Sequence, residues 1–233
     1  MVTKSPPLST APGGGSDEPP ARDSAIQTLL DKILNVGVDG LGLMKGARQI
    51  AEEHMARHAD VDTAVARIIA TRVRLAGATG FATGMGGLLT LPVTIPVDAA
   101  AFYVLAGRCS AAVAHARGYD ITADEVRSVI LISLLGAGGT AVAAEVGVTI
   151  GNKAALAALK ALPDSALIAI NKRVGFRLLT KFGSTGVINL VRVVPLVGGG
   201  TGAVVNIGSM RGIGRYAGTN FPAHLQLDES ATT

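Results

Sequence analysis

The sequence predicts an all-α protein, a compact multi-helix domain with glycine- and alanine-rich apolar helical hairpins and a disordered N-terminal tail. Apolar residues recur at the three- and four-residue spacing of a helix face, and no stretch shows clear strand alternation. Apolar residues make up 48% of the chain and aromatic residues only 3%, while glycine alone numbers 30. Because small side chains let helix backbones approach closely, this composition favours tight helix packing over a core of large rings.

The chain is predicted to consist of three segments. Residues 1–23 are rich in serine, proline and glycine and cannot bury enough apolar surface to offset the entropy of ordering, so we expect a disordered tail. Residues 24–218 form the predicted helical domain, which is long enough for a sizeable core. Residues 219–233 are predicted to be a loose C-terminal tail.

The first helix is predicted to begin at Ser24. Five apolar residues then follow at helical spacing and form one face: Ile26, Leu29, Leu30, Ile33 and Leu34. Glycine is a poor helix former, so Gly37, Gly40 and Gly42 are expected to loosen or break this helix.

Two amphipathic helices are predicted next, over residues 45–58 and 62–75. These two segments hold most of the mixed charge of the chain. An aspartate side chain can accept a hydrogen bond from a free backbone N–H at a helix start, so Asp60 or Asp62 is the expected N-cap of the second helix.

A longer helix is expected from Asp98, as its N-cap, to about Arg117, with Gly118 as its C-terminal stop. The Thr-Ala-Asp-Glu sequence at residues 122–125 matches a capping box, in which the first and last side chains bond each other's backbone. We expect it to open a helix that continues through the apolar run at 128–144.

The C-terminal third is predicted to be helical and basic over residues 153–183, with an interruption near Pro163. A last apolar run at residues 193–210 leads to a helix end near Ala217.

Three uncharged stretches approach the length of a membrane span: 23 residues between Arg74 and Asp98, 17 between Arg127 and Glu145, and 18 between Arg192 and Arg211. A spanning helix needs about 20 predominantly apolar residues. Pro92 and Pro96 interrupt the first stretch, and Pro195 and a glycine triplet interrupt the third. Prolines this close together favour a bent or re-entrant element over a straight span.

Basic residues dominate the stretch at 150–216, where nine lysines and arginines and one acid, Asp164, give a net charge of +8 against +4 for the whole chain. A basic surface beside apolar helices fits an anionic membrane surface, at about 1 kcal/mol per basic residue. The predicted lipid-facing residues are Lys172, Arg173, Arg177, Lys181 and Arg192. The alternative is a solvated helix face. Nucleic acid is not an expected partner, because no aromatic residues interleave with these cations and no nucleic-acid motif is present.

Several kinds of site are not expected in this sequence. The single cysteine, Cys109, excludes an internal disulfide and a cysteine-based zinc site. His54 and His58 share a helix face, but the glutamate that follows the first histidine of a metalloprotease motif is absent. No metal, cofactor or catalytic residue is predicted.

The N-terminus lacks the apolar segment of a secretory signal, so the predicted location is the cytoplasm, at the inner face of the cell membrane.

Three blocks of the chain resemble the EcsC protein family. They are GFATGMGGLLTLPVTIPVD at 80–98, RGYD followed by DEVRSVILISLLG within 117–136, and the glycine-rich stretch INKRVGFRLLTKFGSTGVINLVRVVPLVGGGTGAVVNIGSMRGIGRYA at 170–217. The resemblance covers roughly residues 25–218. It implies structural roles at Pro92, Pro96, Asp98, Asn171, Lys181, Asn189 and Pro195. Where the last block of the family commonly carries an acid, this chain has Asn206, which puts any role of a carboxylate there in doubt.

The resemblance implies a bacterial protein associated with an ABC-type transporter or with the cell envelope. The family has no established activity, so no catalytic residue is carried over. We therefore expect a non-enzymatic, membrane-associated accessory protein that contacts lipid or a membrane partner through its glycine-rich helices and basic C-terminal region. The alternative is a soluble helical domain that binds an apolar small molecule, with or without a reaction on it.

Overall fold

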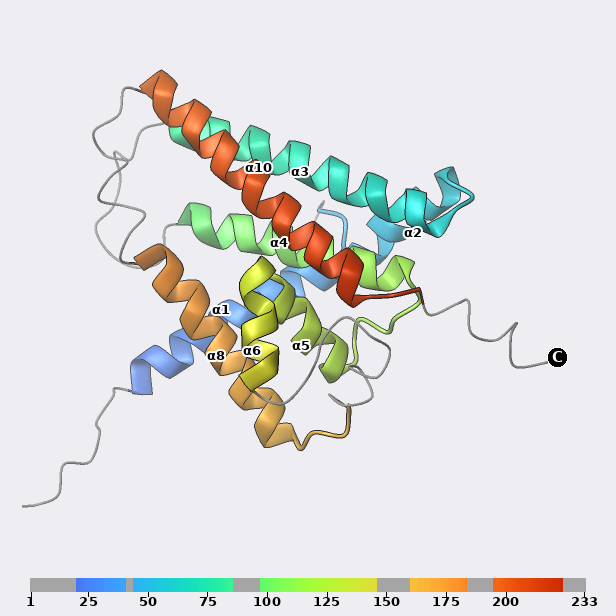
Figure 1. Ribbon diagram of the computed structural model, residues 1–233. Coiled ribbons are helices and arrows are strands. Elements are labelled where there is room, and N and C mark those ends of the chain that lie inside the picture. The colour runs from blue at the N-terminus through green and yellow to red at the C-terminus, as the bar shows by residue number, and fades with distance from the viewer. Residues whose placement is uncertain (1–19, 41–43, 86–96, 146–159, 184–194, 224–233) are drawn as a thin grey trace, which may run out of the picture.

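The computed structural model describes residues 20–40, 44–85, 97–145, 160–183 and 195–223 (Figure 1). Within these ranges the chain is helical and holds no strand, which confirms the predicted all-α fold. The elements are α1 (Pro20–Asp39), α2 (Ala47–Arg57), α3 (Val61–Met85), α4 (Val97–Ala116), α5 (Asp124–Ser133), η1 (Gly136–Gly138), α6 (Gly139–Glu145), α8 (Asp164–Gly183) and α10 (Pro195–Asn220). Most of the predicted N-terminal tail lies outside the described residues.

Helix α4 lies at the centre of the bundle and contacts α1, α2, α3, α5 and α10 (Figure 1). Its middle turns are buried on all sides, and the short side chains at 109–112 let the surrounding helices come close. Removing this apolar surface from water is the main contribution to folding, so the core is organised around α4.

Cys109 lies in the buried middle of α4, and its side chain has no exposed surface. Burial raises the pKa of its thiol to about 12, although the charge of the nearby Arg72 partly opposes the shift. Because the thiolate is the reactive form, we expect the native protein not to react with a disulfide reagent at mildly alkaline pH. In denaturant, a colorimetric thiol assay should count one reactive thiol per chain. Labelling of the native chain at the rate of a free cysteine would contradict the packing of α4.

Helices α1 and α4 cross in close contact at two glycines. A Cβ built on Gly37 would lie 3.2 Å from the backbone nitrogen of Arg108, and one on Gly107 would lie 2.9 Å from Ile33 Cγ2. The prediction that Gly37 breaks the helix is therefore wrong, because the lack of a side chain at this position lets α1 approach α4. Helix α1 begins before the predicted Ser24 and ends at Asp39. The next residue, Gly40, has a φ of +83°, which favours glycine.

Helix α3 begins as predicted but is longer. The Asp60 carboxylate accepts a hydrogen bond from the Thr63 backbone N–H at 2.7 Å, which confirms Asp60 as the N-cap. The expected end at residue 75 is too early, because α3 continues to Met85. Gly77 and Gly80 lie against α10 instead of facing water, so packing compensates for their low helix propensity.

The segment between α4 and α5 corrects one prediction. Gly118 stops α4 as expected, with a φ of +86°. The capping box at residues 122–125 does not form. Instead, the Asp120 carboxylate accepts hydrogen bonds from the Thr122 backbone N–H at 2.9 Å and from its hydroxyl at 2.6 Å. Helix α5 starts at Asp124, with Ala123 as an N-cap that offers no side-chain bond.

The apolar run at 128–144 forms two helices instead of the single helix predicted. Helix α5 ends at Ser133, and Gly136, with a φ of +57°, turns the chain into η1 and α6. A Cβ on Gly139 would lie 2.7 Å from the Ile132 carbonyl oxygen and 2.9 Å from the Tyr216 ring. The turn therefore brings α6 back against α5 and α10, and only glycine fits at this contact.

The interruption near Pro163 is confirmed, because α8 begins at Asp164. At the C-terminus, α10 runs through the glycine triplet to Asn220 and is followed by Phe221, which is fully buried. The Tyr119 hydroxyl donates a hydrogen bond to the Pro222 carbonyl oxygen at 2.7 Å. The boundary predicted at residue 218 thus falls inside α10, and the packed chain continues to residue 222.

Candidate functional site

Helices α3 and α10 lie side by side and antiparallel along most of their length (Figure 1). Three glycines mark where their backbones and side chains meet. A Cβ on Gly77 would lie 2.8 Å from Ile207 Cδ1, and one on Gly214 would lie 2.7 Å from Ile69 Cγ2. A Cβ on Gly80 would lie 2.6 Å from the Gly202 carbonyl oxygen, so the two helices approach closely there too.

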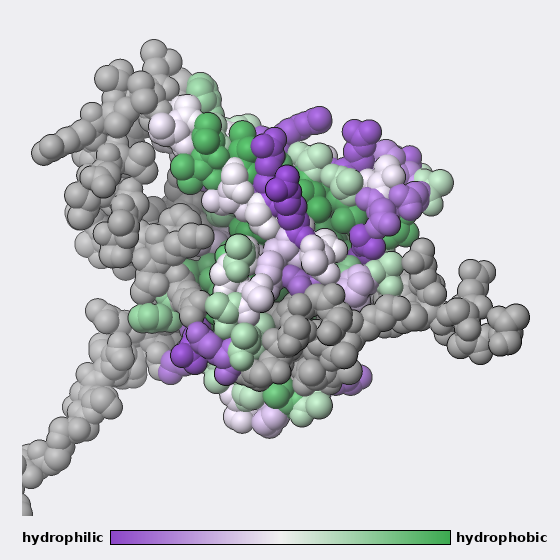
Figure 2. Space-filling view, in the orientation of Figure 1, coloured by the Kyte–Doolittle hydropathy of each residue, from purple (hydrophilic) through white to green (hydrophobic). Residues whose placement is uncertain are grey.

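One half of this pair, residues 75–85 of α3 and 195–210 of α10, carries no charged residue; we call it the apolar end. Large apolar side chains are exposed on it: Leu75, Phe81, Val204 (70% exposed) and Val205. Figure 2 shows hydrophobic residues over this half, whereas hydrophilic residues cover the half near α2. Within the ranges that the structure describes, no helix combines the length and apolar character that crossing a bilayer requires.

Asn206 lies within the apolar end, at the contact between the two helices. Its amide nitrogen would be 2.6 Å from a Cβ on Gly80, so it packs directly on the α3 backbone. A carboxylate at this half-buried position would place a charge between two apolar helix surfaces, at a cost that the neutral amide avoids. The departure from the family pattern at this residue is therefore compatible with close packing.

The outer face of α8 combines apolar and basic side chains. Ile168 and Phe176 are each more than half exposed, and the exposed Lys172 lies between them at a spacing of four residues. Such residues form one stripe along a helix. Arg173 belongs to the same helix, but its Nε forms an ion pair with Glu145 of α6 at 2.8 Å. Glu145 precedes the basic stretch at 150–216, so the net charge of that stretch does not include it.

The other predicted lipid-facing residues are described only in part. For Arg177 and Lys181, in the C-terminal half of α8, the structure describes the backbone alone. This end of α8 lies on the same side of the molecule as the start of α10 and the end of α3 (Figure 1). Arg192 lies outside the described residues. The arrangement thus brings the basic end of α8 to the side of the molecule on which the apolar end lies.

Of the positions implied by the family resemblance, the structure describes Asp98, Asn171, Lys181 and Pro195, which lie on three different helices. Helix α4 begins at Val97, so Asp98 lies in its first turn and not before it, and its side chain is not described. Pro195 is the first residue of α10, where a proline costs no hydrogen bond. Asn171 is half-buried, and its Oδ1 has no hydrogen-bond partner among the described residues. Pro92, Pro96 and Asn189 lie outside the described residues.

Two arginines near the centre of the bundle were not singled out from the sequence. Arg108 is buried and donates a hydrogen bond from Nη2 to the Val36 carbonyl at the end of α1, at 3.0 Å. Burial, and to a lesser degree the charge of the neighbouring Arg72, lowers the pKa of Arg108. A cation at the C-terminal end of a helix is favourable, so Arg108 acts as a structural link between α1 and α4.

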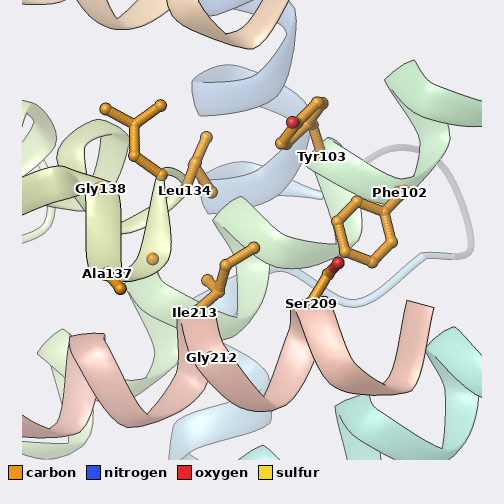
Figure 3. A pocket seen from close by; sticks show the side chains of 10 residues that line it. Phe102, Tyr103, Leu134, Ala137, Gly138, Ser209, Gly212 and Ile213 are labelled. Atoms are coloured by element: carbon orange, nitrogen blue, oxygen red, sulfur yellow. The ribbon is translucent and has the colours of Figure 1, made fainter. Parts of the chain in front are cut away.

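A pocket of about 230 Å³ lies between α4, α10 and the chain that follows α5 (Figure 3). Phe102 and Tyr103 line it from α4, residues 134–138 form a second wall, and Ser209, Gly212 and Ile213 line it from α10. None of the described residues that line it is charged. Burial raises the pKa of the Tyr103 hydroxyl, which therefore stays neutral. The described residues that line the pocket thus offer an apolar space with hydroxyl groups.

These features define an all-α protein with a glycine-packed helix pair, an exposed apolar end and an apolar pocket. The chain belongs to the EcsC protein family, which matches residues 19–222. This match confirms the resemblance carried by the three sequence blocks. No curated protein and no solved structure shows a significant match to the chain.

Proposed function

We propose that this chain is a non-enzymatic accessory protein that binds the anionic surface of a membrane. The apolar end of α3 and α10 contacts the lipid, and the outer face of α8 contacts the headgroups. The observation that carries the proposal is the group of exposed apolar side chains on an end of the helix pair that has no charge. Exposed apolar patches of this kind mark membrane or protein interaction sites.

The outer face of α8 supports the same proposal. Helices that lie in a membrane interface combine basic residues with exposed phenylalanine, leucine or tryptophan side chains. Ile168, Lys172 and Phe176 follow this pattern along one stripe. Arg173 contributes less, because Glu145 already neutralises its charge. We assign the headgroup contact to the other basic residues of α8, Lys172, Arg177 and Lys181.

The family resemblance supports two further parts of the proposal. The membrane is the inner face of a bacterial cell membrane, and an ABC-type transporter is a second partner. The α3–α10 pair also fits this role, because a surface of small and apolar residues can pack against the helices of a membrane protein.

Vesicle flotation tests the electrostatic part. The full chain is expected to float at low salt with phosphatidylcholine vesicles that contain phosphatidylglycerol. Replacing Lys172, Arg177 and Lys181 with glutamine should weaken the binding on the order of a hundredfold, since each basic residue contributes about 1 kcal/mol near the surface. The matched control replaces three exposed arginines of α2 and α3 with glutamine, Arg48, Arg57 and Arg67, and should float as the wild type does.

The apolar part has its own variant. Replacing Phe81, Val204 and Val205 with serine should lower binding to both neutral and anionic vesicles, because it removes apolar surface from the contact. Met44→Ser changes an exposed apolar residue that does not belong to the apolar end and should have no effect. If the wild-type chain stays out of the vesicle fraction at low salt, the proposed function is wrong.

A further inference from the structure

We infer that the pocket between α4, α10 and residues 134–138 binds the hydrocarbon tail of an anionic amphiphile, with a carboxylate or phosphate head at its edge. The residues that line the pocket share only Ser209 with the apolar end, and the inference does not depend on the proposed membrane contact. Three observations carry it: the unfilled volume of the pocket, the chemistry of its walls, and two cations on α10, the helix that forms one wall.

The pocket is open because α10 carries glycine at one position in its wall. A Cβ on Gly212 would meet no atom within 4 Å, and one on Gly136 would meet its nearest atom at 3.8 Å. Gly212, Ala137 and Gly138 are exposed, so the space is accessible from outside. A cavity of about 150 Å³ with apolar walls stays dry and binds benzene, so about 230 Å³ suits about nine carbon atoms.

The walls select an apolar guest. The Phe102 ring, Leu134 and Ile213 surround the space, and the Ser209 side chain points towards it in the view of Figure 3. The Ser209 hydroxyl forms no hydrogen bond with another described residue, so it can donate to a bound oxygen near the edge. A linear hydrocarbon tail with one polar end matches this distribution of groups.

Two exposed cations lie on the same helix within one turn of Gly212. Arg215 follows Gly212 by three residues and Arg211 precedes Arg215 by four, spacings that place neighbours on one helix surface. Both arginines are exposed, and neither forms an ion pair within the described part of the chain. Helix α10 contains no acid. An anionic head held by these guanidinium groups would leave its tail next to Gly212.

Calorimetric titration of the full chain with decanoate tests this inference, with decanol as the uncharged comparison. We expect one decanoate per chain. Gly212→Leu should weaken decanoate binding at least tenfold, because its side chain occupies the pocket. The matched control is Gly208→Leu, one turn earlier on α10, where a Cβ also meets no atom within 4 Å but no pocket is lined. Because both positions are open, both variants should keep the helical circular dichroism spectrum of the wild type.

The head is tested separately. Arg211→Gln combined with Arg215→Gln should weaken decanoate binding several-fold and leave decanol binding unchanged.

Flotation on anionic vesicles distinguishes the source of the tail. If only Gly212→Leu loses vesicle binding, the tail belongs to a membrane lipid. If both leucine variants float normally, the tail belongs to a free fatty acid. No decanoate binding to the wild type, or equal weakening by Gly212→Leu and Gly208→Leu, would overturn the inference. Neither result would affect the proposed membrane contact at the apolar end.

Discussion

Phe221→Ala is expected to destabilise the protein by about 3–5 kcal/mol, the range for removing a buried phenylalanine side chain. Phe221 follows the last turn of α10 and has no exposed surface. Its ring lies 5.3 Å from that of Tyr119, centroid to centroid, and Tyr119 in turn bonds the Pro222 carbonyl. The substitution would therefore leave a cavity where the C-terminal end of α10 meets the chain after α4. Urea denaturation followed by circular dichroism measures the free energy of unfolding.

The control for this substitution is Phe176→Ala. Phe176 is 54% exposed on the outer face of α8, so the same chemical change should alter the free energy of unfolding by less than about 1 kcal/mol. A chain that ends at residue 218 provides a second test, since it should lose at least as much stability as Phe221→Ala. Equal effects of Phe221→Ala and Phe176→Ala would contradict the packed position of residue 221.

The helical fold could be predicted from sequence because apolar spacing and charged caps act locally. Ile33, at the centre of the predicted apolar face, is fully buried, and Asp60 caps α3 as expected. Errors arose where tertiary contacts outweigh local preference. Gly37 was expected to loosen or break its helix, but it lies at a contact with α4, and α3 runs past its predicted end where Gly77 and Gly80 meet α10. The predicted capping box does not form, because the Thr122 hydroxyl and backbone N–H both donate hydrogen bonds to the Asp120 carboxylate instead.

The candidate sites could be predicted only in part. The uncharged stretches identified the helices of the apolar end, because charge is a property of sequence alone. The pairing of α3 with α10 joins segments far apart in the chain, and no pattern in either segment specifies it. The same is true of the ion pair between Arg173 and Glu145. The pocket could not be predicted from the sequence, because its walls come from three separate segments of the chain. The open space at Gly212 can be recognised only once the structure is known.

Gly80→Leu is expected to destabilise the protein by about 3 kcal/mol, at the upper end of the usual cost of overpacking. Its Cβ would lie 2.6 Å from both the Gly202 carbonyl oxygen and the Asn206 amide nitrogen. The amide can rotate away, but the carbonyl belongs to the backbone of α10, so the two helices would have to separate. The gain in helix propensity over glycine is only about 1 kcal/mol and does not compensate. The free energy of unfolding from urea denaturation gives the result.

Gly200→Leu provides the control, because it makes the same change on the partner helix within the apolar end. Gly200 is exposed, and a Cβ there would meet no atom within 4 Å. This substitution should raise stability by about 0.5–1 kcal/mol, since leucine is the better helix former. The two variants therefore differ in sign as well as size. If Gly80→Leu also stabilised the chain, α3 and α10 could not be in backbone contact at this glycine. The apolar end would then have to be a different pairing of helices from the one on which the membrane contact is proposed.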